Sequence, residues 1–315
     1  GIPKESRPFD YRVCLSPAGV EILSHLGHQV FVEHEAGASA GFKDQDYEKA
    51  GGRIVFSPQE VFGRADFLLK VSRPQEMEWI NDGAILAGFL HLASASQDQI
   101  DLLLEKKITA LAYEQVTDAQ GGRAVLRPFS LICGAMVAQI AARWLQTNRG
   151  GKGIMLSGVP GVPPAEVVII GGGAVGTSAA QAMQNAGAHV TVLDKNMAAL
   201  ENIHDKLPGV VTMMATQRNI ERATAYADVV VGAVLVAGQR APMVITRDMV
   251  RAMKPRSVII DVSIDQGGCV ETSRPTMHDN PTFIEEGVVH YCVPNIASTV
   301  ARTASHVFLN SAIPY

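Results

Sequence analysis

Four ionisable residues each follow a short apolar run. Lys70 follows FLL, His91 follows LAGFL, Glu114 follows TALAY, and Asp265 comes just after SVIIDVS. If the runs are parallel strands, these side chains lie at the carboxyl ends, where such sheets bind ligands. An imidazole titrates near neutrality and is suited to proton transfer, and a carboxylate can share that work. Arg12, in a loop near the start of the chain, can join this group of side chains.

Each of these residues also has a structural interpretation. A histidine at a strand end is more often a hydrogen-bonded structural group, and a lysine is usually solvated. Glu114 can pair with a backbone N–H or a cation, and Asp265, in SIDQGGC, can cap a turn. Burying Lys70 beside Arg12 is costly without an anion, so we expect an empty site to attract a carboxylate.

A glycine-rich motif lies in AEVVIIGGGAVGTSAAQ, between a predicted buried strand and a predicted helix. It fits the G-x-G-x-x-G pattern of dinucleotide-binding folds, where the glycines allow a tight turn, close approach of a pyrophosphate, and close packing of helix on strand. The N-terminus of the helix offers free N–H groups to phosphate. The residues predicted to bind the cofactor here are Gly171, Gly173, Ala174, Val175 and Gly176.

Asp194 ends the next predicted strand, 18 residues after Gly176. Its carboxylate can accept hydrogen bonds from a ribose hydroxyl pair and repels a 2′-phosphate, which favours NAD over NADP. A glycine turn that only packs tightly is the alternative. Flavin is less expected, because one such unit beside a catalytic domain suits a nicotinamide cofactor better.

Short apolar runs alternate with helical patterns along most of the chain, which predicts βα units and parallel sheets. The pattern breaks at 117–123, and residues 130–148 read as one long helix with few charges. The predicted fold is α/β, with two doubly wound Rossmann-like domains separated by a cleft and linked by long helices. We expect a substrate-binding, catalytic domain over 1–128, an NAD-binding domain over 129–298, and a helix over 299–315 that returns to the first domain.

Composition excludes several classes of protein. The 315 residues are 47% hydrophobic and 18% charged, with a net charge of −4, so neither disorder nor nucleic-acid binding is expected. No apolar run reaches the roughly 18 residues of a membrane span, and no signal peptide is visible. The four cysteines lack CxxC spacing, which argues against a zinc knuckle and against a disulfide framework and favours free thiols in a reducing cytoplasm.

Longer motifs resemble one family. GIPKE, YRVCLSPAG, LLKV, FLHLA, AYE, SGVPGVPPAEVVIIGGG, VGAVLVAGQRAP, DVSIDQGGC, HYCVPN and NSAIPY are similar to segments of alanine dehydrogenases, and together they span the chain. The resemblance implies an NAD-dependent enzyme that converts L-alanine reversibly to pyruvate and ammonium, working as a cytoplasmic homo-hexamer without a metal.

By motif, the resemblance also implies residue roles. Arg12 and Lys70 would hold the substrate carboxylate and carbonyl side, His91 would hydrogen-bond the reacting oxygen or nitrogen, and Asp265 would activate water or move protons. Asn295 would line the cleft near the nicotinamide. The residues implied at the cofactor are Ser130 at its phosphates, Val234 and Leu235 packed beside it, and Asp194 at the adenosine ribose.

Some positions depart from the family pattern. Leu131 and Ala135 stand where the family usually carries Glu and Arg, Phe89 where a Tyr is often found, and Pro294 where a small residue is common. Two other functions therefore stay open. One is an NAD(H)-binding subunit of a proton-translocating transhydrogenase, although that module lacks the histidine of FLHLA. The other is a catalytically silent NAD-binding relative.

Overall fold

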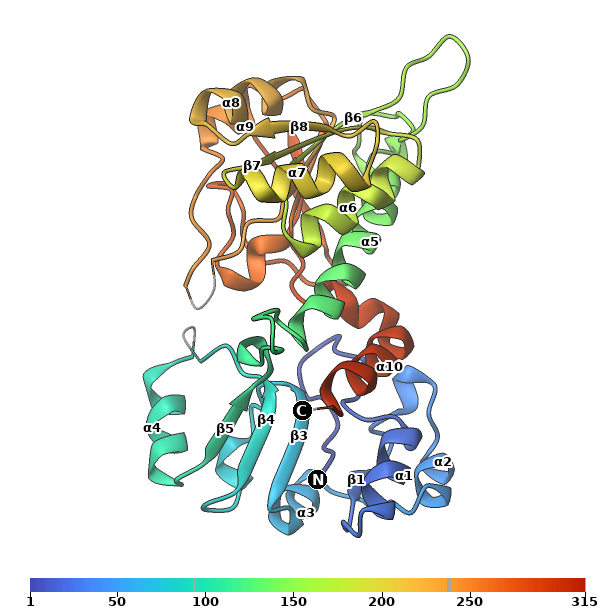
Figure 1. Ribbon diagram of the computed structural model, residues 1–315, viewed down its shortest axis with the longest axis vertical. Coiled ribbons are helices and arrows are strands. Elements are labelled where there is room, and N and C mark those ends of the chain that lie inside the picture. The colour runs from blue at the N-terminus through green and yellow to red at the C-terminus, as the bar shows by residue number, and fades with distance from the viewer. Residues whose placement is uncertain (93–94, 237–238, 315) are drawn as a thin grey trace. The chain divides into compact units, whose positions relative to one another are not determined.

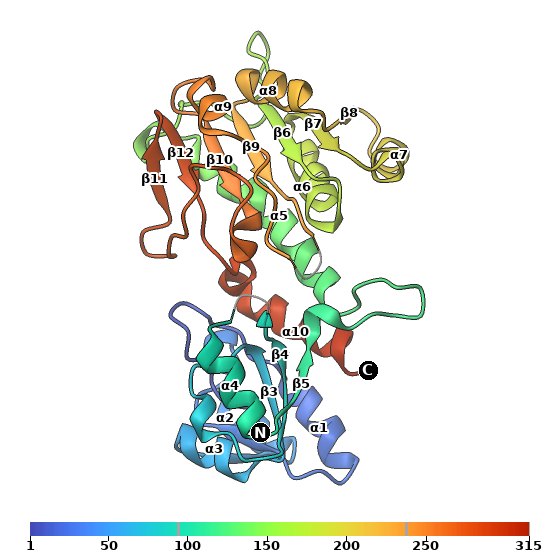
Figure 2. The same ribbon diagram turned by 90° about the vertical axis from the view of Figure 1, so that its left-hand side faces the viewer.

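The computed structural model describes residues 1–92, 95–236 and 239–314. The chain forms two compact units (Figures 1 and 2). Unit 1 consists of Gly1–Phe129 with Ala297–Tyr315, and unit 2 consists of Ser130–Ile296. The segment 299–315 thus belongs to unit 1, apart from Tyr315, which lies outside the described residues. No helix among the described residues is long and apolar enough to cross a membrane.

Unit 1 holds two small parallel sheets, with strand orders β1-β2 and β3-β4-β5. The first two residues of the chain connect them, because Ile2 bonds to β1 and Gly1 bonds to β3 through the backbone. A continuous set of parallel strands results. The strands are β1 (Phe31–Glu33), β2 (Arg53–Val55), β3 (Phe67–Ser72), β4 (Ile85–Phe89) and β5 (Thr109–Ala112).

Helices connect these strands, as expected for parallel pairs, which need crossover connections. Their apolar faces and the strands enclose a core that includes Phe62, Leu68, Leu86 and Leu90. The helical elements of unit 1 are α1 (Pro17–His25), η1 (Ala38–Ala40), α2 (Asp44–Lys49), α3 (Pro58–Arg64), η2 (Met77–Trp79), α4 (Gln97–Glu105), η4 (Tyr113–Gln115) and α10 (Ala301–Ala312), with η7 (Ile296–Val300) immediately before α10.

Unit 2 is built on a seven-stranded sheet of order β11-β12-β10-β9-β6-β7-β8. Apart from β11, which is antiparallel to β12, the strands are parallel and follow the strand order of dinucleotide-binding folds. They are β6 (Glu166–Ile170), β7 (His189–Asp194), β8 (Val211–Met214), β9 (Val229–Gly232), β10 (Val258–Asp261), β11 (Thr282–Glu285) and β12 (Val288–Tyr291).

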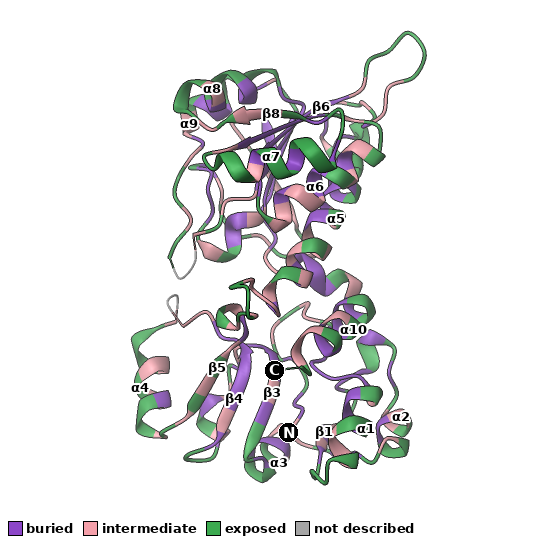
Figure 3. Cartoon of the chain, in the orientation of Figure 1, coloured by how far each residue is buried: buried purple, intermediate pink, exposed green. Residues whose placement is uncertain are grey.

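Central strands of unit 2 are buried on both faces, which explains uninterrupted apolar runs such as EVVII and VVVG. Figure 3 shows this burial and the exposed outer side of α7. The helical elements are α5 (Leu126–Trp144), whose first four residues lie in unit 1, η5 (Thr147–Arg149), α6 (Ala174–Asn185), α7 (Met197–Lys206), α8 (Gln217–Tyr226), α9 (Arg247–Arg251) and η6 (Val262–Gln266).

The structure differs from the sequence expectation at two elements. Helix α5 begins at Leu126, four residues before the predicted start. Pro128 falls in its first turn, where the missing N–H costs no hydrogen bond. The β11–β12 hairpin was not predicted as strands. The alternation of parallel strands and helices is as predicted in both units. The predicted cleft between the two domains stays a prediction.

Candidate active site

The glycine motif forms the turn from β6 into α6. Gly171 has φ of 107°, a left-handed conformation, and a Cβ there would overlap with the carbonyl oxygen of Ala233. A Cβ on Gly176 would overlap with the carbonyl oxygen of Gly171. Two of the glycines are therefore required by the protein's own packing.

Gly173 is different. It is the N-cap of α6 and supplies no side-chain cap, and a Cβ at this position would meet no atom of the described residues within 4 Å. Open space therefore lies beside the first turn of α6, whose Ala174 and Val175 are partly exposed. A helix N-terminus with free N–H groups and room beside it fits the phosphates of a dinucleotide.

Asp194 lies against this turn at the end of β7. Its Oδ2 accepts a 2.6 Å hydrogen bond from the Gly172 N–H, and its Oδ1 accepts one of 2.7 Å from Asn196. Each carboxylate oxygen has two lone pairs, so capacity remains for the hydroxyls of a ribose.

Two further segments reach the region of α6. The Ser178 hydroxyl donates to the Leu131 carbonyl at 2.8 Å, and a Cβ on Gly134 would lie 2.5 Å from the carbonyl oxygen of Val175. The start of α5, with Ser130, therefore packs against the first turns of α6. Val234 follows β9, next to Gly171, while Leu235 is exposed.

In unit 1, Arg12 is held by a carboxylate that the sequence did not single out. Its Nε and Nη2 donate to the two oxygens of Asp10 at 2.7 and 2.6 Å, and Ser72 donates to the same carboxylate. Both ionic side chains are almost fully buried. Burial would raise the pKa of Asp10, but the charge and hydrogen bonds of Arg12 outweigh it and lower that pKa.

Lys70 also has its own acid. Its Nζ lies 3.3 Å from Glu5 Oε2 and donates to the Lys4 carbonyl at 2.8 Å. Glu5 accepts hydrogen bonds from the N–H groups of Val71 and Ser72. Burial raises the pKa of Glu5, against the opposing charge of Lys70. The expectation that these two cations wait for an anion is therefore wrong in part, because each is already paired with a buried carboxylate.

His91 follows β4, beside the end of β3. Its φ of 44° is left-handed, and its ring stacks on Phe89 with centroids 6.3 Å apart. Ser72 and Phe89 are register partners on β3 and β4, so Arg12, Lys70 and His91 gather around one edge of the sheet. The backbone N–H of His91 donates to Glu114. Glu114 therefore pairs with a backbone N–H, as the structural alternative for this residue predicted.

Asp265 and Asn295 meet in unit 2. Asp265 is exposed in η6, and its Oδ1 accepts a 3.2 Å hydrogen bond from the Asn295 N–H. The buried Asp261, at the end of β10, accepts hydrogen bonds from the backbone N–H groups of Ser263, Cys269 and Val270. Sequence reasoning missed Asp261, although an acidic residue at the end of a buried strand was a usable signal.

Comparison with known proteins assigns the chain to a family. Residues 1–133 match the alanine dehydrogenase/PNT N-terminal domain model, and residues 137–315 match the corresponding C-terminal domain model. The chain belongs to the alanine dehydrogenase/PNT family. This membership confirms the resemblance and the two-domain α/β fold inferred from the sequence.

Individual relatives agree with this assignment. The alanine dehydrogenase of Halomonas elongata is 45% identical over all of this chain and 85% of its own length, and that of Mycobacterium tuberculosis is 41% identical with the same coverage. A solved L-alanine dehydrogenase matches with a TM-score of 0.93 at 42% identity, covering 100% of this chain and 88% of that one. A transhydrogenase from Sinorhizobium meliloti matches at 0.85 and 28%, covering 99% and 91%.

The structure shows the contacts and exposure of the four positions that depart from the alanine dehydrogenase pattern. Phe89 packs edge-on against Tyr113 and Phe129, so a ring without a hydroxyl suits this apolar cluster. Leu131 is 43% exposed, although its carbonyl bonds to Ser178. Ala135 is exposed and Pro294 is partly buried. Nothing in the structure explains why Ala135 and Pro294 stand at their positions.

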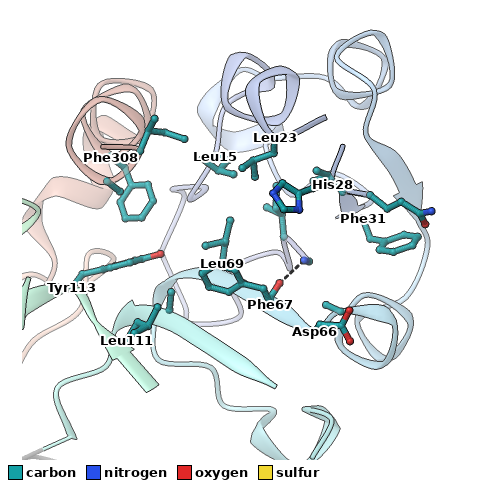
Figure 4. Close-up of a pocket in the computed structure, with 18 of the residues that line it drawn as sticks. Leu15, Leu23, His28, Phe31, Asp66, Phe67, Leu69, Leu111, Tyr113 and Phe308 are labelled. Atoms are coloured by element: carbon teal, nitrogen blue, oxygen red, sulfur yellow. Dashed lines mark hydrogen bonds between the residues drawn. The ribbon is translucent and has the colours of Figure 1, made fainter. Parts of the chain in front are cut away.

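Unit 1 of this alanine dehydrogenase family member also contains an apolar cavity of about 900 Å³. Figure 4 shows Leu15, Leu23 and Phe308 projecting toward it, with Leu69 and Leu111 on the sheet side. None of the side chains predicted to bind substrate or cofactor lines it. The cavity is therefore separate from the candidate active site.

Proposed function

We propose that this protein catalyses the reversible oxidative deamination of L-alanine to pyruvate and ammonium with NAD as coenzyme. The observation that carries the proposal is similarity to alanine dehydrogenases along the entire chain. The residues that hold Arg12, Lys70 and His91 at one sheet edge support it.

Unit 2 would hold the coenzyme. The open N-terminus of α6 at Gly173 suits the pyrophosphate, and the carboxylate of Asp194 suits unsubstituted ribose hydroxyls, which favours NAD over NADP. Ser130, Val234 and Leu235 would complete this site. When bound, the nicotinamide accepts the hydride from the α-carbon of alanine or returns it to the imine of pyruvate.

Unit 1 would hold the substrate. Asp10 orients the Arg12 guanidinium through hydrogen bonds from Nε and Nη2, and the oriented guanidinium would bind the substrate carboxylate. Two contacts engage the Lys70 ammonium, which leaves a third hydrogen for the carbonyl side of the substrate.

Proton transfer is proposed for His91 and Asp265. Loss of hydride from alanine gives an iminium, which adds water to form a carbinolamine, and that species collapses to pyruvate and ammonium. His91 would exchange protons with the reacting nitrogen or oxygen, Asp265 would activate the water, and Asn295 would line the site near the nicotinamide.

A subunit that exchanges hydride in a membrane transhydrogenase is the second candidate. The match to a transhydrogenase structure favours it, but the 28% identity is well below the 41–45% to alanine dehydrogenases. His91 separates the two, because hydride exchange between nucleotides needs no acid–base group for an amino acid. Hexameric assembly and a cytoplasmic location remain part of the alanine dehydrogenase proposal.

An assay of coenzyme oxidation tests the proposal. NADH should be oxidised only when pyruvate and ammonium are both present, and NADPH should be a poor substitute. The variant His91→Ala should lose turnover by about 100-fold or more, because acid–base groups contribute roughly 10²–10⁴-fold, and should still bind NADH. Turnover without ammonium would contradict the proposed reaction, and near-normal turnover in His91→Ala would contradict the role of His91.

A further inference from the structure

The backbone around His91 is held by two side chains of opposite charge. The Glu114 carboxylate accepts hydrogen bonds from the N–H groups of Leu90 at 3.2 Å and His91 at 2.7 Å. The Nη1 of Arg73 donates to the carbonyls of the same two residues, at 2.8 and 3.1 Å. All four backbone polar groups of this dipeptide are therefore bound by Arg73 and Glu114.

This position needs such support for two reasons. Strand β4 ends at Phe89, so residues 90 and 91 lie beyond the sheet ladder, and Leu90 is fully buried. His91 also takes a left-handed conformation, with φ of 44°, which a residue with a Cβ rarely adopts without surrounding support. Charge-assisted hydrogen bonds accepted by a carboxylate and donated by a guanidinium are strong enough to supply this support.

The two holding residues are themselves fixed. Arg73 directly follows β3, and its backbone N–H donates to the Phe89 carbonyl at 3.2 Å. Glu114 lies in η4, where its carbonyl accepts a 2.7 Å hydrogen bond from Arg123, and the neighbouring Tyr113 packs edge-on against Phe89 and Phe308. Both are thus anchored to elements on either side of β4.

We propose that Arg73 and Glu114 are positioning residues for catalysis: together they lock the Leu90–His91 backbone so that the imidazole meets the reacting atoms of the substrate. The inference rests on the proposed role of His91 in alanine dehydrogenation. Neither residue touches substrate in this scheme, and each acts through His91 alone.

Kinetics of Arg73→Met and Glu114→Gln test the proposal. Each variant should lower kcat for reductive amination of pyruvate by about 10- to 100-fold, because small misplacements of a reacting group cost rates of that order. KM for pyruvate and the Kd for NADH should stay close to the wild-type values, since Arg12, Lys70 and unit 2 are untouched. Arg64→Met and Glu105→Gln remove like charges elsewhere in unit 1 and should change nothing.

A double-variant comparison separates positioning from general structural damage. Single-turnover hydride transfer is measured for Glu114→Gln in the wild-type background and in a His91→Gln background. The loss should be large in the first and nearly absent in the second, because a residue that acts through His91 has no effect once the imidazole is gone. The same loss in both backgrounds overturns the proposal, as does a kcat of Arg73→Met equal to that of Arg64→Met.

Failure of the proposed function gives a different pattern. In that case the wild-type protein shows no turnover with pyruvate and ammonium, or His91→Ala retains it. If both of those results support the function, only the Arg73 and Glu114 variants decide the inference. Should Glu114→Gln fail to fold, Arg73→Met carries the same double-variant comparison, and Glu114→Asp, which keeps the charge at a shorter reach, should show an intermediate kcat.

Discussion

At the scale of single residues, the proposed substrate site contains two buried cations that are each paired with a buried carboxylate. Arg12 and Lys70 carry two positive charges, and Asp10 and Glu5 carry two negative ones within direct contact. Buried charges are tolerated only when they are paired and hydrogen-bonded, and these four meet that condition. A substrate carboxylate therefore has to compete with, or share, the donors that Asp10 and Glu5 already use.

The ion pair of Asp10 and Arg12 makes a prediction about pH. The folded protein lowers the pKa of Asp10, so the pair stabilises the fold above the ordinary value of about 3.9 and loses this contribution as pH falls through the lowered value. Asp10→Asn removes the buried carboxylate that pairs with Arg12 and should reduce the free energy of unfolding near pH 7 by about 3–5 kcal/mol. Below pH 4 the difference from wild type should shrink.

Urea unfolding at a series of pH values from about 3 to 7 measures this difference. Asp82→Asn, which changes an exposed aspartate in the same unit, is the control and should follow the wild-type curve. A constant gap between wild type and Asp10→Asn across the pH range would show that the pair does not titrate as described.

At the scale of elements, the turn from β6 to α6 combines two demands on glycine. Gly171 and Gly176 are needed so that helix and strand can approach each other, whereas Gly173 borders open space. The close approach at Gly171 and Gly176 is needed for folding, whereas the open space at Gly173 is where we expect the coenzyme phosphates to bind. Substitutions at Gly176 and Gly173 can therefore test protein stability and coenzyme binding separately.

Gly176→Ala should destabilise the protein by at least about 1–3 kcal/mol, because its Cβ overlaps with the Gly171 carbonyl. Gly173→Ala should have a free energy of unfolding within about 0.5 kcal/mol of the wild-type value, since its Cβ meets no atom of the residues that the structure describes. Its Kd for NADH should nevertheless rise by about tenfold or more, which corresponds to roughly 1.4 kcal/mol. Urea unfolding and NADH fluorescence titration measure the two effects, and normal NADH affinity in Gly173→Ala would argue against phosphate binding at this turn.

At the scale of the whole molecule, the chain divides its tasks between two units with different sheets. Unit 2 carries the strand order of a dinucleotide-binding fold, and unit 1 carries the buried cations and His91. Large apolar side chains are exposed in the loop before β6, including Met155, Val159 and Val162. Exposed apolar groups of this kind are typical of surfaces that another chain covers.

We expect the protein to assemble as a homo-hexamer, as its resemblance to alanine dehydrogenases implies. Light scattering coupled to gel filtration should give a mass of six chains of 33.6 kDa each, independent of loading concentration over the micromolar range. Val162→Asp places a charge on the exposed loop and should reduce the share of the hexamer if that loop is covered. A single-chain mass for the wild type would contradict the expectation.

Sequence by itself determined the α/β class, the glycine turn and the family. Buried parallel strands are uniformly apolar and their helices follow a different period, so local patterns identify them without knowledge of partners. The position of His91 just beyond the end of β4 follows from the same alternation, whereas Lys70 lies within β3 and Asp265 lies in η6, four residues after β10. Strand β11 lies at the sheet edge and has no fully buried residue, so it lacks the uniformly apolar run that marks the central strands, and its hairpin with β12 escaped prediction.

Only the tertiary structure decided which charges meet. Glu5 reaches Lys70 from 65 positions away, Ser72 reaches Asp10 from 62, and Glu114 reaches the His91 N–H from 23. No local pattern encodes such pairs, since the strength of a buried charge interaction depends on distance and exclusion of water, which exist only after folding. For the same reason, the sequence could not identify Arg73 and Glu114 as the residues that bind the His91 backbone, because they come next to His91 only when β3, β4 and β5 pair.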